Sequence, residues 1–137
     1  MKTVVNASQE ISYEAPTEDH RRFQLLISPL LSGTQRVAAG HLLLPPGSAQ
    51  GSAESHPETE EIYYCARGKG KLMLDGAEHP LEEGTVAYVG FDVPHQVFNT
   101  GDEDLLMIWF ESPPSCQEDE YKPMKLGWKQ VAGLTNV

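Results

Sequence analysis

Hydrophobic residues along this chain gather in short segments that glycine, proline and acidic residues separate. RVAAGHLLL, residues 36–44, ends at a Pro-Pro-Gly sequence, and EIYYCAR, residues 61–67, ends at Gly68. No segment of helical length has a clean 3.6-residue period. Short segments rich in β-branched and aromatic residues, spaced roughly 8–12 residues apart, are typical of an all-β sandwich or barrel.

A hairpin and three more strands follow in the central part of the chain. Residues 70–81, GKLMLDGAEHPL, predict two strands around an Asp75-Gly76 turn, because Asp-Gly suits the tight turns of hairpins. In the N-terminal part of the chain, residues 4–16 and 21–31 could each supply a strand that extends one sheet. Further strands are predicted over residues 85–90, 95–99 and 105–110, and residues 124–137 fit either a strand or a short helix.

The chain of 137 residues is long enough for one domain with a single sizeable core. We expect that domain to span residues 1–137, with a core at 36–110 on which the segments 1–35 and 111–137 pack. Its 39% of hydrophobic and 22% of charged residues are typical of a soluble globular protein. No apolar run approaches the ~20 residues that cross a bilayer, so no membrane association is expected.

The charge balance excludes two classes of partner. With 20 acidic and 10 basic residues, the net charge is −10, which argues against a nucleic-acid partner and against docking to anionic lipid. The N-terminal residues have no apolar region of a signal peptide, so a cytoplasmic location is expected. Cys65 and Cys116 fit two free thiols in a reducing compartment better than a disulfide.

Candidate metal ligands follow from side-chain direction, because successive residues of a strand face opposite sides of a sheet. If Glu61 faces the barrel interior, so does Tyr63, and an inward His95 could meet Glu61 there. His56 lies in the loop before the first of these strands and could reach the same point. Glu54 points the same way as His56 if that loop is extended.

Two imidazoles with one or two carboxylates form a donor set that transition metals use. Two histidines and one carboxylate with open positions suit non-haem Fe(II), and a second carboxylate shifts the preference toward Mn(II) or Fe(II). Glu61 favours a bound cation, because a carboxylate inside a barrel is costly without a charge partner. The alternative is the same barrel without a metal. Glu58 and Glu60 are expected to be solvated loop acids.

The chain resembles the cupin superfamily of small jelly-roll β-barrels in two motifs. The family's first motif is a Gly, then His-x-His, three or four residues, Glu, six residues and Gly. Here Glu54-x-His56 is followed by four residues, Glu61, six residues and Gly68. The second motif, with a histidine and an asparagine at its end, matches GTVAYVGFDVPHQVFN, which ends in His95 and Asn99. The resemblance covers roughly residues 36–110 and implies an all-β cupin jelly-roll barrel.

Three positions depart from the family's pattern. Glu54 stands where the family has a histidine, Gly90 replaces a proline, and Asp92 replaces a glycine, so Asp92 must accept the backbone angles of that turn. The resemblance implies that His56, Glu61 and His95 bind the ion. Some cupins, including ureidoglycine aminohydrolases, use glutamate at the position of Glu54, which here either ligates the ion or accepts a proton or hydrogen bond beside it.

The resemblance implies one divalent transition metal, Mn, Fe, Ni or Zn, with Mn or Fe favoured. Tyr63 is the best candidate for a hydroxyl that lines the pocket, because it shares a face with Glu61. His41 alternates with Ala39 and Leu43, so it could face the cavity as a substrate-binding or proton-transfer group, or be a structural histidine. The candidate catalytic residues are therefore Glu54, Tyr63 and His41.

The function that we expect is metal-dependent Lewis-acid chemistry on a small oxygen-rich metabolite, of the isomerase, cyclase, lyase or hydrolase type. The alternatives are an Fe(II) cupin dioxygenase and a cupin that binds a sugar or another metabolite without turnover, because this fold does not determine one chemistry. The resemblance also implies a homodimer. The apolar segment FQLLISPLL, residues 23–31, is a plausible surface for the partner.

Overall fold

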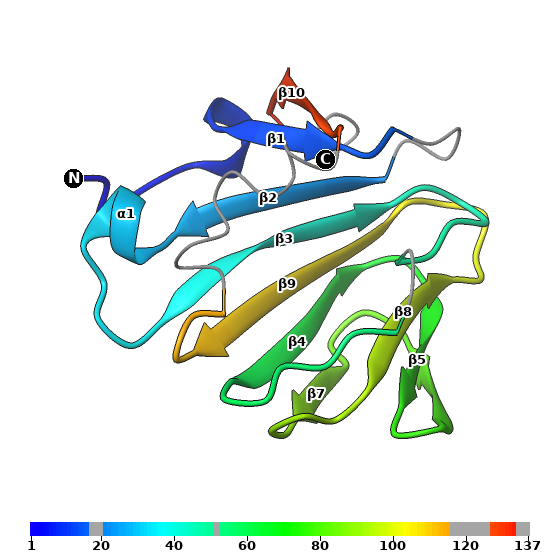
Figure 1. Ribbon diagram of the computed structural model, residues 1–137. Coiled ribbons are helices and arrows are strands. Elements are labelled where there is room, and N and C mark those ends of the chain that lie inside the picture. Colours follow the sequence, from blue (N-terminus) through cyan, green and yellow to red (C-terminus); the bar gives the residue numbers. More distant parts are fainter. Residues whose placement is uncertain (17–20, 51–52, 116–126, 134–137) are drawn as a thin grey trace.

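The computed structural model describes residues 1–16, 21–50, 53–115 and 127–133. Within these residues the strands form two antiparallel sheets (Figure 1). The larger sheet has the spatial order β10 (Lys129–Ala132), β1 (Ile11–Glu14), β2 (Arg22–Ile27), β3 (Ala38–Leu44), β9 (Leu105–Ser112), β4 (Glu60–Arg67) and β7 (Val86–Val89). The smaller sheet has the order β6 (Ala77–Leu81), β5 (Gly70–Leu74) and β8 (His95–Asn99).

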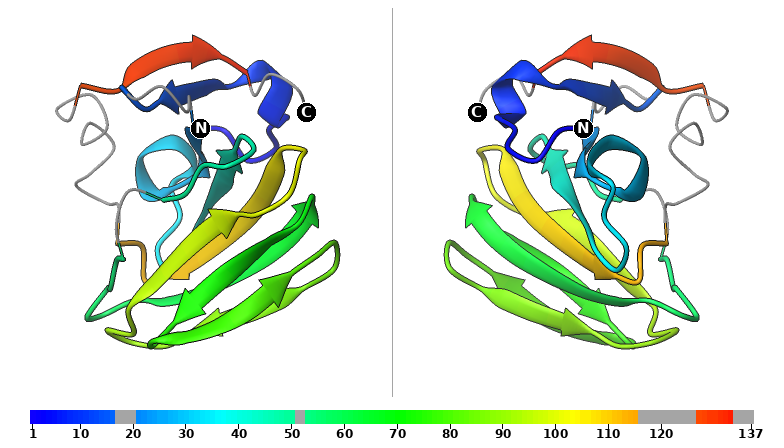
Figure 2. Two further views of the ribbon diagram at one scale, coloured as in Figure 1. Left: turned by 90° about the vertical axis from the view of Figure 1, so that its right-hand side faces the viewer. Right: turned by 90° about the vertical axis from the view of Figure 1, so that its left-hand side faces the viewer.

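The predicted all-β fold is confirmed, and its core lies between the two sheets. Leu72 and Val97 of the smaller sheet are buried in the same cluster as Leu44, Met107 and Trp109 of the larger one. Figure 2 shows β1 and β10 at one edge of the molecule, far from the green strands that close the other end. β1 and β10 thus extend the larger sheet at one edge, whereas β2 packs Phe23 and Leu25 against the core.

The segment predicted as a strand over residues 21–31 is only in part a strand. β2 ends at Ile27, and a short helix α1 (Pro29–Ser32) follows. The Ser28 side chain caps this helix by accepting a hydrogen bond from the backbone N–H of Leu31, and the helix ends at Gly33 with a φ of 73°. A serine cap, a proline in the first turn and a terminal glycine are strong local helix signals that override the apolar strand pattern.

The N-terminal residues, the described part of the tail (residues 127–133) and the hairpin turn can also be compared with the predictions. The C-terminal strand β10 pairs with β1, so the tail forms a strand there, and a 3-10 helix (Ala7–Gln9) precedes β1. Asp75 and Gly76 both have positive φ values, 50° and 81°, as the predicted hairpin turn requires. Cys116 lies outside the described residues. Among the described helices, none is long and apolar enough to cross a membrane.

Candidate metal centre

Strand β4 directs its odd-numbered side chains into the core, as predicted. Glu61, Tyr63 and Cys65 are 4%, 3% and 0% exposed, whereas Ile62 and Tyr64 between them are 44% and 40% exposed. In β4 the strand period therefore places a carboxylate and a phenol side by side within the protein.

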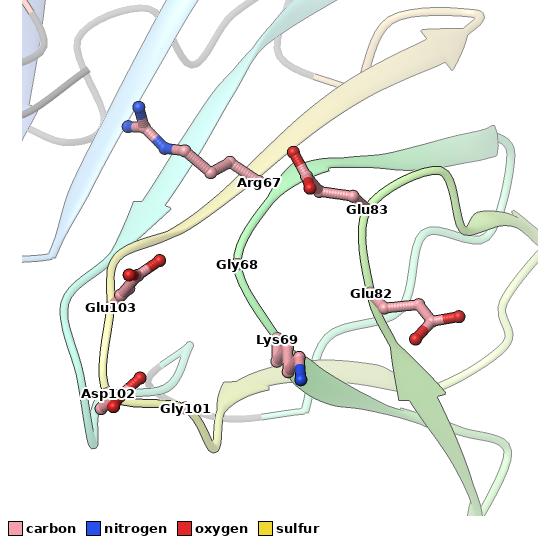
Figure 3. Close-up of a pocket in the computed structure, with 8 residues that line it drawn as sticks. All are labelled: Arg67, Gly68, Lys69, Glu82, Glu83, Gly101, Asp102 and Glu103. Atoms are coloured by element: carbon pink, nitrogen blue, oxygen red, sulfur yellow. The ribbon is translucent and has the colours of Figure 1, made fainter.

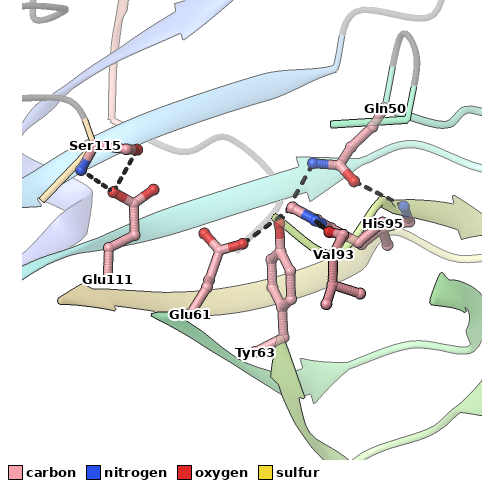
Figure 4. Close-up of polar contacts among 8 residues, drawn as sticks. Gln50, Glu61, Tyr63, Val93, His95, Glu111 and Ser115 are labelled. Atoms are coloured by element: carbon pink, nitrogen blue, oxygen red, sulfur yellow. Dashed lines mark hydrogen bonds and ion pairs between the residues drawn. The ribbon is translucent and has the colours of Figure 1, made fainter. Parts of the chain in front are cut away.

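His95, at the start of β8, is oriented by its backbone neighbours. Its side chain is buried, and Nδ1 lies 3.0 Å from the carbonyl oxygen of Val93, which can only accept, so Nδ1 carries the hydrogen. The Nε2 atom then faces Glu61, whose Oε1 is 3.1 Å away (Figure 4). A neutral His95 thus presents an Nε2 lone pair at the site, which is the arrangement of a metal ligand.

The loop that carries Glu54 and His56 is held against β8 by backbone hydrogen bonds. Glu54 and His95 form an antiparallel bridge in which each N–H donates to the other's carbonyl, at 2.9 and 2.8 Å. The carbonyl of His56 accepts from the N–H of Asp92 at 2.8 Å. Asp92 has a φ of 56°, so the aspartate at the family's glycine position does adopt the backbone angles of that turn.

The structure brings the four predicted ligands into one neighbourhood. Potential ligand atoms of Glu54, His56 and His95 all lie within 4.8 Å of one another. His56 forms a second such group with Glu61 and Glu111. The rings of His56 and His95 are 5.4 Å apart between centroids. The two groups share His56, and the contact between Glu61 and His95 joins them, so they adjoin in the core.

Glu111 is the member of this cluster that the sequence interpretation missed. It lies on β9 directly opposite Glu61 and is buried, and its Oε2 accepts hydrogen bonds from N–H and Oγ of Ser115 (Figure 4). A signal was present, because Glu111 follows Met107 and Trp109 at the strand period of two.

The cluster fits a divalent cation. Glu61 Oε1 and His95 Nε2 are buried 3.1 Å apart, and among the described residues neither has a well-formed hydrogen bond to any other group. Buried polar atoms with so few partners cost free energy, which a cation bound by both would offset. Two imidazoles and up to three carboxylates are a donor set for Mn(II), Fe(II) or a similar ion.

Burial and the charges within the cluster shift the pKa values of His95 and Tyr63. Burial alone would lower the pKa of His95, but the Glu61 carboxylate, the Val93 carbonyl and the charge of Glu54 together raise it. Burial, with the charges of Glu61 and Glu54, raises the pKa of Tyr63 well above its usual value, and a hydrogen bond from Gln50 opposes this only in part. The Tyr63 phenol is therefore neutral at physiological pH and can donate a hydrogen bond.

The expectation that His41 faces the cavity is wrong. On β3 the core face is formed by Ala38, Leu42 and Leu44, whereas His41 alternates with them and lies on the other face. Its register partner is Ile108, which also lies outside the core cluster. The period of two allows either face, and the packing of the smaller sheet decides which one becomes the interior.

A separate surface hollow of about 450 Å³ lies at the other end of β4. Arg67 is on its rim, six residues from Glu61, which is roughly 20 Å along a strand. The hollow therefore does not belong to the candidate centre. Figure 3 shows its lining residues: Arg67, Gly68, Lys69, Glu82, Glu83, Gly101, Asp102 and Glu103.

Comparison with known proteins identifies the family. The cupin domain matches residues 40–111, more than half of the chain. The chain belongs to the cupin family. The matched segment begins in β3 and ends on Glu111, so it contains every residue of the cluster described above. For this cupin, the family suggested by the two sequence motifs agrees with the fold of two packed sheets.

Some of the relatives and solved structures that are similar to this cupin carry the names of enzymes. It is 27% identical to an uncharacterized protein of Methanocaldococcus jannaschii, over 75% of this chain and 82% of that protein. It is 36% identical to a glucose-6-phosphate isomerase of Thermococcus onnurineus, over 43% of this chain and 34% of that enzyme. A predicted oxalate decarboxylase of Thermotoga maritima superimposes with a TM-score of 0.70 and 26% identity, covering 82% of this chain and 100% of that one.

Proposed function

We propose that this cupin is a metal-dependent enzyme that acts on a small, oxygen-rich metabolite without redox chemistry. The observation that carries the proposal is a pair of groups of potential ligand atoms that share His56, one with Glu54 and His95 and one with Glu61 and Glu111, together with the buried contact of 3.1 Å between Glu61 Oε1 and His95 Nε2. When bound there, a divalent ion supplies Lewis-acid stabilisation of negative charge on a substrate oxygen.

The similar proteins support the choice of substrate class. Two of them are named for small oxygen-rich molecules, glucose 6-phosphate and oxalate, and for isomerisation and decarboxylation. Isomerisation through an enediolate builds negative charge on oxygen, and loss of CO2 leaves an electron pair on carbon, so a fixed cation and a proton donor serve either reaction. We therefore propose an isomerase or lyase reaction, within the wider set that includes cyclases and hydrolases.

Two residues of this chain supply the proton chemistry. The buried Tyr63 hydroxyl has its pKa raised, so it stays protonated and can donate to an oxygen that gains charge. Its ring lies 5.8 Å from that of His95, between centroids, which places it beside the ligands. Glu54 is exposed and close to both histidines, so it can serve as fourth ligand or accept a proton from the substrate.

Metal content tests the proposal. Wild-type protein purified without chelators should carry a divalent ion, and the His56→Ala and Glu61→Ala variants should lose most of it, as measured by elemental analysis. Glu58→Gln is the matched control, because Glu58 is an exposed acid of the same loop. Equal metal content in wild type and both alanine variants would rule out this site.

Further measurements on variants and on the wild type distinguish the two possible roles of Glu54 and the alternative functions. If Glu54→Gln loses metal, Glu54 is a ligand; if it keeps metal but loses turnover, Glu54 accepts a proton. Oxygen uptake with catechols, thiols and keto acids should be absent, and uptake with any of them would replace the Lewis-acid proposal by a dioxygenase. A protein that binds a sugar or another metabolite but no metal would instead be a binding module.

A further inference from the structure

Two buried carboxylates face each other across strands β4 and β9. Glu61 and Glu111 are direct register partners and are only 4% and 7% exposed. Side chains of such antiparallel partners lie on the same face, about 5 Å apart at Cβ. Like charges at this separation, away from water, repel strongly, so the pair needs a positive charge or a proton between them.

The contacts of the two carboxylates leave room for a cation. Glu111 accepts both hydrogen bonds of Ser115 at one oxygen, Oε2, at 2.8 Å from N and 2.7 Å from Oγ. These donors are neutral and do not cancel its charge. Glu61 Oε1 has the His95 ring at 3.1 Å as its polar neighbour, and a ligand atom of His56 lies within 4.8 Å of ligand atoms of both carboxylates.

We propose that Glu111 is a ligand of the metal ion, beside His56 and Glu61, and that Ser115 holds its carboxylate in the binding orientation. This inference rests on the proposed function, since it adds a ligand to the same centre. It assigns a role to a residue that follows both sequence motifs along the chain. The Ser115 contacts have the form of the outer hydrogen bonds that commonly orient metal-binding carboxylates.

A ligand at Glu111 changes which ions the centre prefers. In the group of His56, Glu61 and Glu111, two carboxylate oxygens stand beside one imidazole nitrogen. Oxygen-rich sites favour hard ions such as Mn(II) over softer ones. Removal of one carboxylate should therefore weaken Mn(II) binding more than Zn(II) binding, which a purely structural role of Glu111 would not do.

Titration of metal-free protein with Mn(II) and with Zn(II), followed by calorimetry, tests the proposal. Glu111→Gln, which keeps the shape and the Ser115 contacts, should weaken Mn(II) binding by at least about tenfold. Ser115→Ala should weaken it less, and Glu58→Gln should leave it unchanged. Circular dichroism checks that each variant is folded, and Glu111→Asp, which keeps the charge but shortens the reach, serves if the glutamine variant does not fold.

The outcomes separate this inference from the proposed function. If wild type binds Mn(II) and Glu111→Gln binds it equally well, Glu111 is no ligand, while the metal-dependent function stands. If wild type binds neither ion, both ideas fail together. Loss of Mn(II) affinity in Glu111→Gln, with a smaller loss for Zn(II), supports the assignment whatever substrate is later found.

Discussion

Four glutamates between residues 54 and 61 have the same chemistry but different surroundings. Glu61 is buried beside His95. Glu54 is exposed, and its backbone forms a bridge with the backbone of His95. Glu58 and Glu60 are exposed, as predicted, and Glu60 accepts a hydrogen bond from Tyr88 on the outer surface. The strand period and the bridge to β8 separate these roles, because they determine which carboxylates point toward the histidines.

At the residue scale, His41 should make the protein less stable in acid. Its Nδ1 is buried without a hydrogen-bond partner among the described residues, and burial lowers its pKa from 6.5. As the pH falls, His41 therefore becomes protonated in the unfolded chain before it does so in the folded protein. The contribution of His41 to the free energy of unfolding is full above about pH 6.5 and falls as the pH drops below it. Urea unfolding at about pH 8 and about pH 5.5 should show a smaller loss for His41→Gln than for wild type.

His95 titrates in both of these proteins, so its effect cancels in the comparison. An equal loss of unfolding free energy in wild type and His41→Gln between the two pH values would show that His41 does not contribute. The measurement should use metal-free protein, because a bound ion would add its own pH dependence.

At the scale of the elements, β3 depends on a glycine at its centre. A Cβ on Gly40 would lie 2.0 Å from the backbone oxygen of Gln24 and 2.4 Å from the Trp109 ring. Trp109 is held in turn by a stacked Phe23, with ring centroids 5.5 Å apart. The close packing of β2, β3 and β9 therefore leaves no space for a side chain at this position.

Gly40→Ala should lower the free energy of unfolding by about 1–3 kcal/mol or more, because the backbone of β2 must move to admit the methyl group. Gly90→Ala is the matched control: its Cβ would meet its nearest atoms at 3.6 Å, and its φ is not positive. Its effect should stay within about 0.5–1 kcal/mol. Equal stabilities of the two variants in urea would contradict the tight contact at Gly40.

The sequence pattern predicted most of these elements to within a few residues. Aromatic and β-branched residues in short segments predicted β4 and β8, and local turn signals mark their ends; burial then alternates along both strands, although neighbouring residues are often of the same polarity. The segment after Ile27 differs from the prediction, because its apolar residues fit both a strand and a short helix. The Ser28 cap, Pro29 and Gly33 favour the helix, and the apolar pattern does not register them.

At the scale of the whole molecule, one face of the larger sheet exposes a group of bulky apolar and aromatic side chains. Ile62 pairs with Tyr88 and with Phe110, and Tyr64 pairs with Val86, so five bulky side chains adjoin on β7, β4 and β9. They are 40–61% exposed. A chain with a net charge of −10 would associate most easily with its own copy through a face that is mostly apolar, and here the acid beside the five side chains is Glu60, which Tyr88 hydrogen-bonds. A two-fold contact needs one self-complementary face of this kind.

We propose that the predicted homodimer forms through this face rather than through residues 23–31, where Leu30 is the large side chain that is strongly exposed. Ile62→Glu should then give a monomer, and Leu30→Glu should remain a dimer, as measured by light scattering coupled to gel filtration. If Leu30→Glu dissociates the dimer and Ile62→Glu does not, the interface lies at residues 23–31. A monomeric wild type would make the dimer prediction wrong.

The sequence by itself determined the strands, the cupin family resemblance and the neighbourhood of His56, Glu61 and His95. It could do so because turn residues and the period of two are local, and because the spacing within the two motifs places these residues relative to the strands. The tertiary structure alone decided that Glu111 joins Glu61 and that His41 points away. Both depend on the register and packing of strands far apart in the chain, and no local pattern encodes which face of a sheet its partner covers.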